Sequence, residues 1–183
     1  MKNTLKLIVF LGITTALFSS CEPKSPFPEI KNGANFVARP DPLPAAVTAA
    51  NITTMNVALV NVASANMTFT TQSLNANEIE KVEVYASHLR GTTVTPAATT
   101  AAPHGVLLKA LASINGKEQV AVSELLTKTG MKVADLRAND RLRIRFVVIM
   151  KDGRVFSWQN AGPGINANPL GTTFTPLLDV LLQ

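Results

Sequence analysis

The sequence contains one cysteine, Cys21, and its position gives the clearest chemical signal in the chain. Two lysines stand among the first six residues, an apolar run follows over 7–18, and two serines lead into Cys21. This order of charged, apolar and small residues is typical of a secretory signal peptide, and the apolar run is too short to span a bilayer comfortably. We therefore predict a signal peptide over residues 1–20, which leaves 183 − 20 = 163 residues in the mature chain.

The thiol of Cys21 stands where a lipid could be attached. Residues 17–21, Leu-Phe-Ser-Ser-Cys, resemble a bacterial lipobox, in which the thiol receives a diacylglycerol and the freed amine is acylated. Each buried methylene contributes about 0.8 kcal/mol, so several chains anchor a protein durably. Plain secretion is the alternative, and it would leave an unpaired thiol in an oxidising compartment. We predict a lipid on Cys21 that attaches the protein to a membrane of the cell envelope.

The composition limits the partners of the mature chain. Removal of the first 20 residues takes away two lysines, so the formal charge falls from +5 to +3. That excess is too small to indicate a nucleic-acid partner. A lipid on the sole cysteine leaves no thiol for a disulfide, so an apolar core must stabilise the fold.

Prolines divide the mature chain into a tether and a domain. Residues 21–45 contain six of them, which favour extended chain and deny donors to a regular ladder: Pro23, Pro26, Pro28, Pro40, Pro42 and Pro44. We predict a lipid-anchored tether over 21–45, with a possible first edge strand at 30–37, and a domain over 46–183.

Within the domain, short segments alternate between apolar and polar residues, which is the pattern of half-buried strands. Thr68, for example, stands between Met67 and Phe69. The expected strands cover 55–62, 66–72, 79–86, 106–114, 118–122, 141–150 and 174–182. About seven strands predict an all-β fold, an antiparallel immunoglobulin-like β-sandwich.

Two details of this fold follow from turn and cap residues. One short helix is expected between an N-cap at Ser123 and a left-handed stop at Gly130, with Leu125 and Leu126 toward the core. The last strand contains Pro176, which suggests a place at a sheet edge.

A hairpin is expected around Asp152 and Gly153, which suit a two-residue type I′ turn. That register places Ile149, Phe156 and Trp158 together on the face opposite the one that holds the apolar residues of 142–146. Both faces near the hairpin would then be apolar, so either this end of the strand is covered on both sides or one face is a contact surface. A three-residue turn with a bulge would shift the register and reverse this assignment.

The residues that could catalyse a reaction are few. His88 and His104 stand in or beside the loop over 92–103, where solvated histidines are expected, and a zinc site needs three or four converging ligands. Glu80 and Glu83 point to opposite faces of one strand, whereas glycoside hydrolysis needs two carboxylates held together. Asp135, Asp140 and Asp152 are expected in turns, where aspartate commonly bonds nearby backbone. We predict no catalytic pair, no metal and no cofactor.

Three arginines form a basic stripe on one strand face. Arg141, Arg143 and Arg145 alternate with apolar residues, so their side chains share a side of the sheet. Such a stripe could bind acidic sugars or phosphate through bidentate hydrogen bonds. A solvated outer face that discourages edge aggregation explains the same residues.

Tyr85 and Trp158 are the aromatic residues with a polar group, which suits a position at the edge of the surface. Tyr85 is expected on the face of 79–86 that also carries Glu83. Sugar binding would need one of these rings exposed beside the loop 91–102 or the loop 160–171. The loop 91–102 is long enough for recognition, although a disordered insertion fits its composition equally well.

Several short motifs resemble those of one family. They are Phe-Pro-Glu-Ile-Lys-Asn-Gly-Ala at 27–34, Lys-Val-Glu-Val-Tyr at 81–85, Ala-Asp-Leu at 134–136, Asn-Asp at 139–140, and Lys-Asp-Gly-Arg-Val-Phe-Ser at 151–157 with Asn160. Together they resemble exported lipoproteins of Bacteroidota, of the accessory class encoded beside starch-utilisation-type outer-membrane porins. The resemblance implies an immunoglobulin-like sandwich and a role in glycan capture or uptake. Many such relatives continue into further domains.

Two functions are therefore expected. The first is a non-catalytic accessory glycan-binding module of an outer-membrane polysaccharide uptake system. The alternative is a structural or protein-interaction lipoprotein that docks an envelope partner through an apolar β-face. The candidate contact residues, for a ligand or a partner, are Trp158, Tyr85, Phe156, Arg143 and Arg145.

Overall fold

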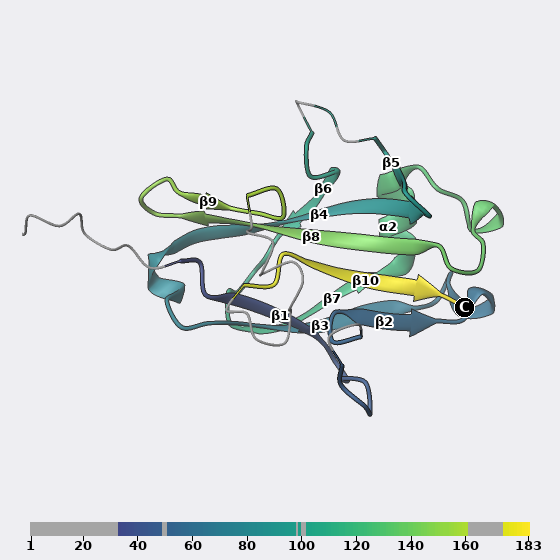
Figure 1. The fold of residues 1–183 in the computed structure, drawn as a ribbon, viewed down its shortest axis with the longest axis horizontal. Coiled ribbons are helices and arrows are strands. Elements are labelled where there is room, and N and C mark those ends of the chain that lie inside the picture. The colour runs from purple at the N-terminus through teal and green to yellow at the C-terminus, as the bar shows by residue number, and fades with distance from the viewer. Residues whose placement is uncertain (1–32, 49–50, 98, 100–101, 161–173) are drawn as a thin grey trace, which may run out of the picture. The chain divides into compact units, whose positions relative to one another are not determined.

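The computed structural model describes residues 33–48, 51–97, 99, 102–160 and 174–183 (Figure 1). The predicted signal peptide, Cys21 and the loop 161–173 lie outside these residues. The described part is mostly β and includes one α-helix, as the sequence predicts.

The strands form two sheets. The smaller one has the order β1 (Phe36–Pro40), β3 (Asn66–Ser73), β7 (Gly116–Ala121). The larger one has the order β2 (Thr54–Val57), β10 (Leu177–Leu182), β8 (Arg141–Met150), β4 (Ile79–Arg90), β5 (Thr93–Thr95), with β6 (Val106–Ala110) beside β4 and β9 (Val155–Phe156) beside β8. The pairing is antiparallel except between β10 and β2, which run parallel.

The inner faces of the two sheets share one core. The ring of Phe146 on β8 lies 5.3 Å from that of Phe36 on β1 and 5.7 Å from that of Phe69 on β3, measured between centroids. All three side chains are completely buried. Tilted and edge-on ring contacts of this kind stabilise the packing beyond the area that they bury.

The period-two alternation predicts the inward faces correctly. Met67 and Phe69 on β3, and Val82 and Val84 on β4, are fully buried. Leu142 on β8 is fully buried as well. The polar residues between them therefore lie on the outer faces of the sheets.

The α-helix, α2 (Val122–Thr129), contacts β4, β6 and β7. It ends at Gly130, whose φ of 73° is left-handed, as predicted. Its N-cap is Ala121 rather than Ser123, because β7 runs directly into the helix and the buried Val122 begins it. Three short 3-10 helices complete the described elements: η1 (Leu59–Asn61), η2 (Ala76–Glu78) and η3 (Val133–Asp135).

Two expectations about the ends of the domain need correction. β1 lies inside the segment 21–45 that the prolines predict to be a tether. It is an edge strand, as expected for 30–37, but it covers 36–40, and its Phe36 and Ala38 are part of the core. β10 is not an edge strand, since it lies between β2 and β8. Pro176 stands just before β10, where its missing N–H interrupts no pairing, and its carbonyl accepts a hydrogen bond from the Phe146 N–H.

The hairpin between β8 and β9 has the bulged register rather than the two-residue one. Ile149 pairs with Val155, and Val148 pairs with Phe156. The turn has three residues, with Gly153 left-handed at φ 84° and its N–H bonded to the Met150 carbonyl. Phe156 consequently packs on the core side, so the expected apolar surface of Ile149, Phe156 and Trp158 is wrong.

Candidate functional site

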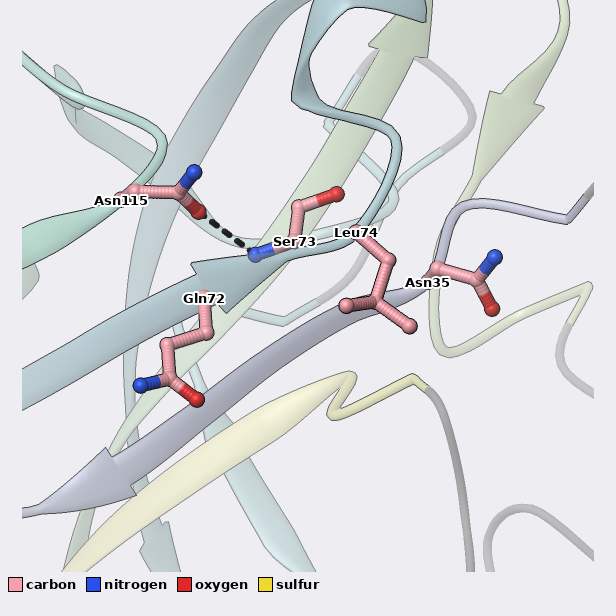
Figure 2. A pocket seen from close by; sticks show the side chains of 5 residues that line it. All are labelled: Asn35, Gln72, Ser73, Leu74 and Asn115. Carbon is pink, nitrogen blue, oxygen red and sulfur yellow. Dashed lines mark hydrogen bonds between the residues drawn. The ribbon is translucent and has the colours of Figure 1, made fainter.

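The described surface has several hollows. Two of them, one beside each sheet, are large, and a smaller one of about 380 Å³ is lined by Arg141 and Arg143. The first, of about 630 Å³, lies at the end of β1 and β3 (Figure 2). Leu74, 94% exposed, is surrounded there by the amides of Asn35, Gln72 and Asn115. The Asn115 amide oxygen accepts a hydrogen bond from the Ser73 N–H at 2.6 Å. This hollow offers amide groups and one aliphatic side chain, with neither a ring nor a charge among its lining residues.

The second hollow, of about 530 Å³, lies where β4 and β6 meet the loop that follows β5. Tyr85 on β4 and Leu107 on β6 are cross-strand partners in its wall. Pro96, Pro103 and His104 line it from the loop. Leu107 is 48% exposed, so the wall combines a phenol, an imidazole and open apolar surface.

Gly105 is the residue that lets the loop approach β4. Its φ is 105°, and a Cβ atom at this position would stand 2.4 Å from the Ala86 carbonyl oxygen. Only glycine tolerates that backbone conformation and that approach. The close approach places the His104 ring 5.3 Å from the Tyr85 ring, between centroids, at a tilt of 58°.

The phenol of Tyr85 is held by an acid on its own strand. Its hydroxyl donates to Glu83 Oε2 at 2.8 Å, and Glu83 Oε1 lies 2.8 Å from Lys81 Nζ. Burial, and then the bond to Glu83, raise the pKa of Tyr85 to about 12. The hydrogen bond from Lys81 lowers the pKa of Glu83, so this carboxylate stays charged near neutral pH.

Arg145 on β8 lies directly opposite Tyr85 in the strand register. The sequence led us to expect a solvated side chain here. That expectation is wrong, since Arg145 is only 8% exposed. Nη1 donates to Ser87 Oγ at 3.0 Å and to the His104 carbonyl at 3.0 Å. Nε is buried and, among the described residues, has no hydrogen-bond partner. Burial, and then the charge of Arg143, lower the pKa of Arg145.

His104 completes this group. Burial lowers the pKa of its imidazole, while a hydrogen bond with the Gln159 side chain acts in the opposite direction. Its Nδ1 is buried without a hydrogen-bond partner in the described part of the chain. Gln159 also donates to the Pro103 carbonyl at 2.7 Å, which brings the segment after β9 against the loop. Trp158, half-buried, is next to Gln159 in the chain.

The other end of the arginine stripe is paired with an acid. Arg143 makes two hydrogen bonds of 2.7 Å to Asp179 of β10, and Arg141 adds one of 3.2 Å. Asp179 is only 2% exposed. We missed this residue in the sequence. A lone acid in the apolar segment 177–182 was the available signal, because a buried carboxylate requires a cationic partner.

At the end of β4 the expectation for His88 is wrong, whereas Asp140 bonds nearby backbone as expected, because its Oδ2 accepts from the Arg137 N–H at 3.0 Å. His88 is not a solvated loop residue: it is 2% exposed, on the core face of the strand. Asp140 is equally buried, with two hydrogen bonds from Arg90 at 2.9 and 2.6 Å and with His88 Nε2 3.1 Å away. Arg90 first, and His88 further, hold the pKa of Asp140 well below its usual range. This buried cluster ties the end of β4 to the start of β8.

The structure thus brings two of the five candidate residues, Tyr85 and Arg145, side by side in the strand register. Tyr85 lines the hollow, and Arg145 bonds to the carbonyl of His104, which also lines it. Arg143 lies on the same face of β8, two residues along, in its pair with Asp179. Phe156 points the other way, with its ring 6.5 Å from that of Phe174. The residues that sequence reasoning did not assign to this site are His104, Leu107 and Gln159, which come from the loop, from β6 and from the segment after β9.

Comparison of this chain with protein-family models, with curated proteins and with solved structures finds no significant match. Among the described residues, none of the helices has the length and apolar character needed to cross a membrane.

Proposed function

We propose that this chain is a non-catalytic glycan-binding module at the outer membrane, an accessory of a polysaccharide uptake system, attached through a lipid on Cys21. The observation that carries the proposal is the hollow beside Tyr85, where an aromatic ring, an imidazole and exposed apolar surface meet. Sugars combine apolar ring faces with many hydroxyls, so they suit a wall that is both apolar and rich in hydrogen-bonding groups.

The order of the strands supports an immunoglobulin-like sandwich as the scaffold. In that fold one sheet contains strands A, B and E side by side, and the other contains C, F and G. The sheet β1-β3-β7 and the run β4-β8-β10 have this order, with β5 and β6 in the place of additional strands beside C. The proposed site then lies on the outer face of the C-F-G sheet.

The protein-docking alternative is the weaker proposal. It depends on Ile149, Phe156 and Trp158 forming one apolar face, and the bulged hairpin turns Phe156 toward the core. Val155 takes its place beside Ile149 on the outer face, and it is a much smaller side chain.

Titration of the purified full chain in detergent with a panel of neutral and acidic oligosaccharides tests glycan binding. Trp158 is the only tryptophan, and Gln159 beside it contacts the rim of the hollow, so its fluorescence reports binding there. We expect a saturable change with one class of glycan. Tyr85→Ala should weaken binding at least about tenfold because the ring is lost, whereas Tyr85→Phe should retain most of the affinity.

Leu74→Ala is the matched control, because it alters the amide-lined hollow on the other sheet. It should leave the affinity unchanged. Binding that is lost in Leu74→Ala and kept in Tyr85→Ala would move the site to the other hollow. The lipid anchor is tested separately by Cys21→Ser, which should shift the protein from the membrane fraction to the soluble fraction. Retention in the membrane fraction would contradict attachment through this residue.

A further inference from the structure

Arg145 differs from the other arginines of its strand in the surroundings of its charge. Its guanidinium is buried, and within the described residues no carboxylate forms an ion pair with it. Its hydrogen-bond acceptors, Ser87 Oγ and the His104 carbonyl, are neutral. Burial of a charge without a counter-charge costs several kcal/mol, so such a group is retained in a fold for a reason other than its own stability.

The nearest acids on this face are occupied by other cations. Glu83 pairs with Lys81, and Asp179 pairs with Arg143 and Arg141. Lys81 and the three arginines of β8 are four cations against the two anions Glu83 and Asp179, so this group of described residues has a net charge of 4 − 2 = +2. The segment 161–173, which follows in the sequence, contains no acidic residue.

Two side-chain nitrogen atoms beside the Tyr85 hollow lack hydrogen-bond partners among the described residues. They are Arg145 Nε and His104 Nδ1, and both are buried. His104 and Tyr85 line the hollow. Arg145 is not one of the lining residues, but it pairs with Tyr85 in the strand register and donates to the His104 carbonyl, so it contacts the residues that form the wall. Arg145 Nε is a donor, and a buried donor that remains unpaired costs about 1–3 kcal/mol, which an oxyanion of a ligand would recover.

From these observations we infer that the glycan bound at the Tyr85 hollow is acidic, with an oxyanion that binds Arg145 next to His104. This inference rests on the proposed function and names its class of ligand. Tyr85 and Leu107 contact the sugar ring, and the guanidinium attracts the oxyanion in surroundings where water screens little. Arginine binds carboxylate and sulfate oxygens in the same planar geometry, so a uronic acid and a sulfated sugar are the two sources of this chemistry.

Calorimetric titration of the full chain in detergent with three oligosaccharides of equal length tests the inference. They are tetragalacturonate, its fully methyl-esterified form, which keeps the rings and loses the charge, and a sulfated galactan tetrasaccharide. We expect the carboxylate or the sulfate form to bind at least about tenfold more tightly than the ester, as a charge-assisted hydrogen bond provides. The form that binds identifies the source of the oxyanion.

Variants then assign the preference to Arg145. In Arg145→Met the acidic and esterified forms should bind within about twofold of each other. Arg141→Met is the matched control, because it removes the same charge from the same face of β8 at the far end, and the preference should persist. Should Arg145→Met fail to fold, Arg145→Lys keeps the charge and removes Nε, and part of the preference should remain.

The outcomes separate this inference from the proposed function. Equal affinity for the acid, the sulfate and the ester would overturn the acidic ligand and leave glycan binding in place. Equal loss of preference in Arg141→Met and Arg145→Met would overturn the assignment to Arg145. Absence of binding to all three, and to the neutral panel, would contradict both.

Discussion

On the outer face of β8, Arg143 and Arg145 stand two residues apart on the same strand and have opposite surroundings. Arg143 forms a two-bond ion pair with the buried Asp179 of β10. Arg145, at the end near the hollow, bonds to a hydroxyl and a carbonyl, and its Nε remains unpaired in the described part of the chain. Arg143 lines a hollow of about 380 Å³ but is neutralised by Asp179, whereas Arg145, next to the residues of the Tyr85 hollow, has no ion-pair partner among the described residues.

The difference teaches how a proposed binding residue can be separated from a structural one within a single repeating pattern. A charge that is fully paired inside the fold serves the fold, and its removal leaves its partner buried and alone. A buried charge without a counter-charge in the fold is a candidate for pairing with a charged group of a ligand. The sequence alternation places both residues on the same face of the strand. What distinguishes them is the residue that each meets on the neighbouring strands, Asp179 on β10 for Arg143 and Ser87 on β4 for Arg145.

The largest expected effect on stability comes from breaking the ion pair between Arg143 and Asp179. Asp179→Asn keeps the shape of the side chain and leaves Arg143 without a counter-charge, so we expect the free energy of unfolding to fall by about 3 kcal/mol. Urea unfolding measures this change. The matched control is Asp152→Asn, since the exposed pair of Asp152 with Arg154 should contribute less than about 1 kcal/mol. Similar losses in both variants would contradict the structural role of Asp179.

The next effect concerns the hollow at the other end. Gly105→Ala should destabilise the protein by about 2 kcal/mol and weaken glycan binding, because a Cβ would collide with the Ala86 carbonyl and pull the loop from β4. Gly116→Ala is the control, because the nearest atoms to its Cβ are 3.7 Å away, at ordinary contact distance. Unchanged binding in Gly105→Ala would show that the close approach of the loop does not form the site.

A smaller effect is the pH dependence that His104 brings to this end. Because its pKa is lowered in the folded protein, the unfolded chain takes up a proton first as the pH falls below about 6.5. Stability should therefore be complete above that pH and decrease below it. Comparison of urea midpoints between pH 7.5 and 5.5 in the wild type and in His104→Gln measures this contribution, and identical pH profiles would contradict it.

The smallest effect is spectroscopic. Tyr85 is the only tyrosine, so an ultraviolet absorbance titration follows it directly, and its ionisation should occur near pH 12 in the folded protein. Glu83→Gln should lower this pKa only in part, since burial is the larger cause. Ionisation near pH 10 in the native protein would show that the ring is more exposed than the structure places it.

Local pattern was sufficient where the fold depends on periodicity. The alternation around Phe69, Val82 and Leu142 correctly gave the buried faces, because side chains of a strand alternate strictly between its two sides. Gly130 correctly gave the end of the helix, because a left-handed residue is a local requirement. Tyr85 was placed on the outer face for the same reason.

The turn type and the side-chain partners depend on contacts between strands distant in the sequence, so local pattern could not predict them. Whether Asp152 and Gly153 form a two-residue or a bulged turn depends on how β9 packs, and one residue of difference turned Phe156 inward. The pairing of Arg143 with Asp179 joins residues 36 apart, and no local pattern specifies it. His104 reaches the site only because Gly105 permits a contact with β4, which becomes visible once β4 and β6 are paired.

The central claim is that Arg143 stabilises the fold while Arg145 serves a ligand, and urea unfolding of Arg143→Met and Arg145→Met tests it most directly. We predict that Arg143→Met lowers the free energy of unfolding by about 3 kcal/mol, because Asp179 loses its two-bond partner. Arg145→Met should lower it by less than about 1 kcal/mol, since the lost hydrogen bonds are offset by relief of a buried, unpaired charge. A loss in Arg145→Met as large as that in Arg143→Met would contradict the account.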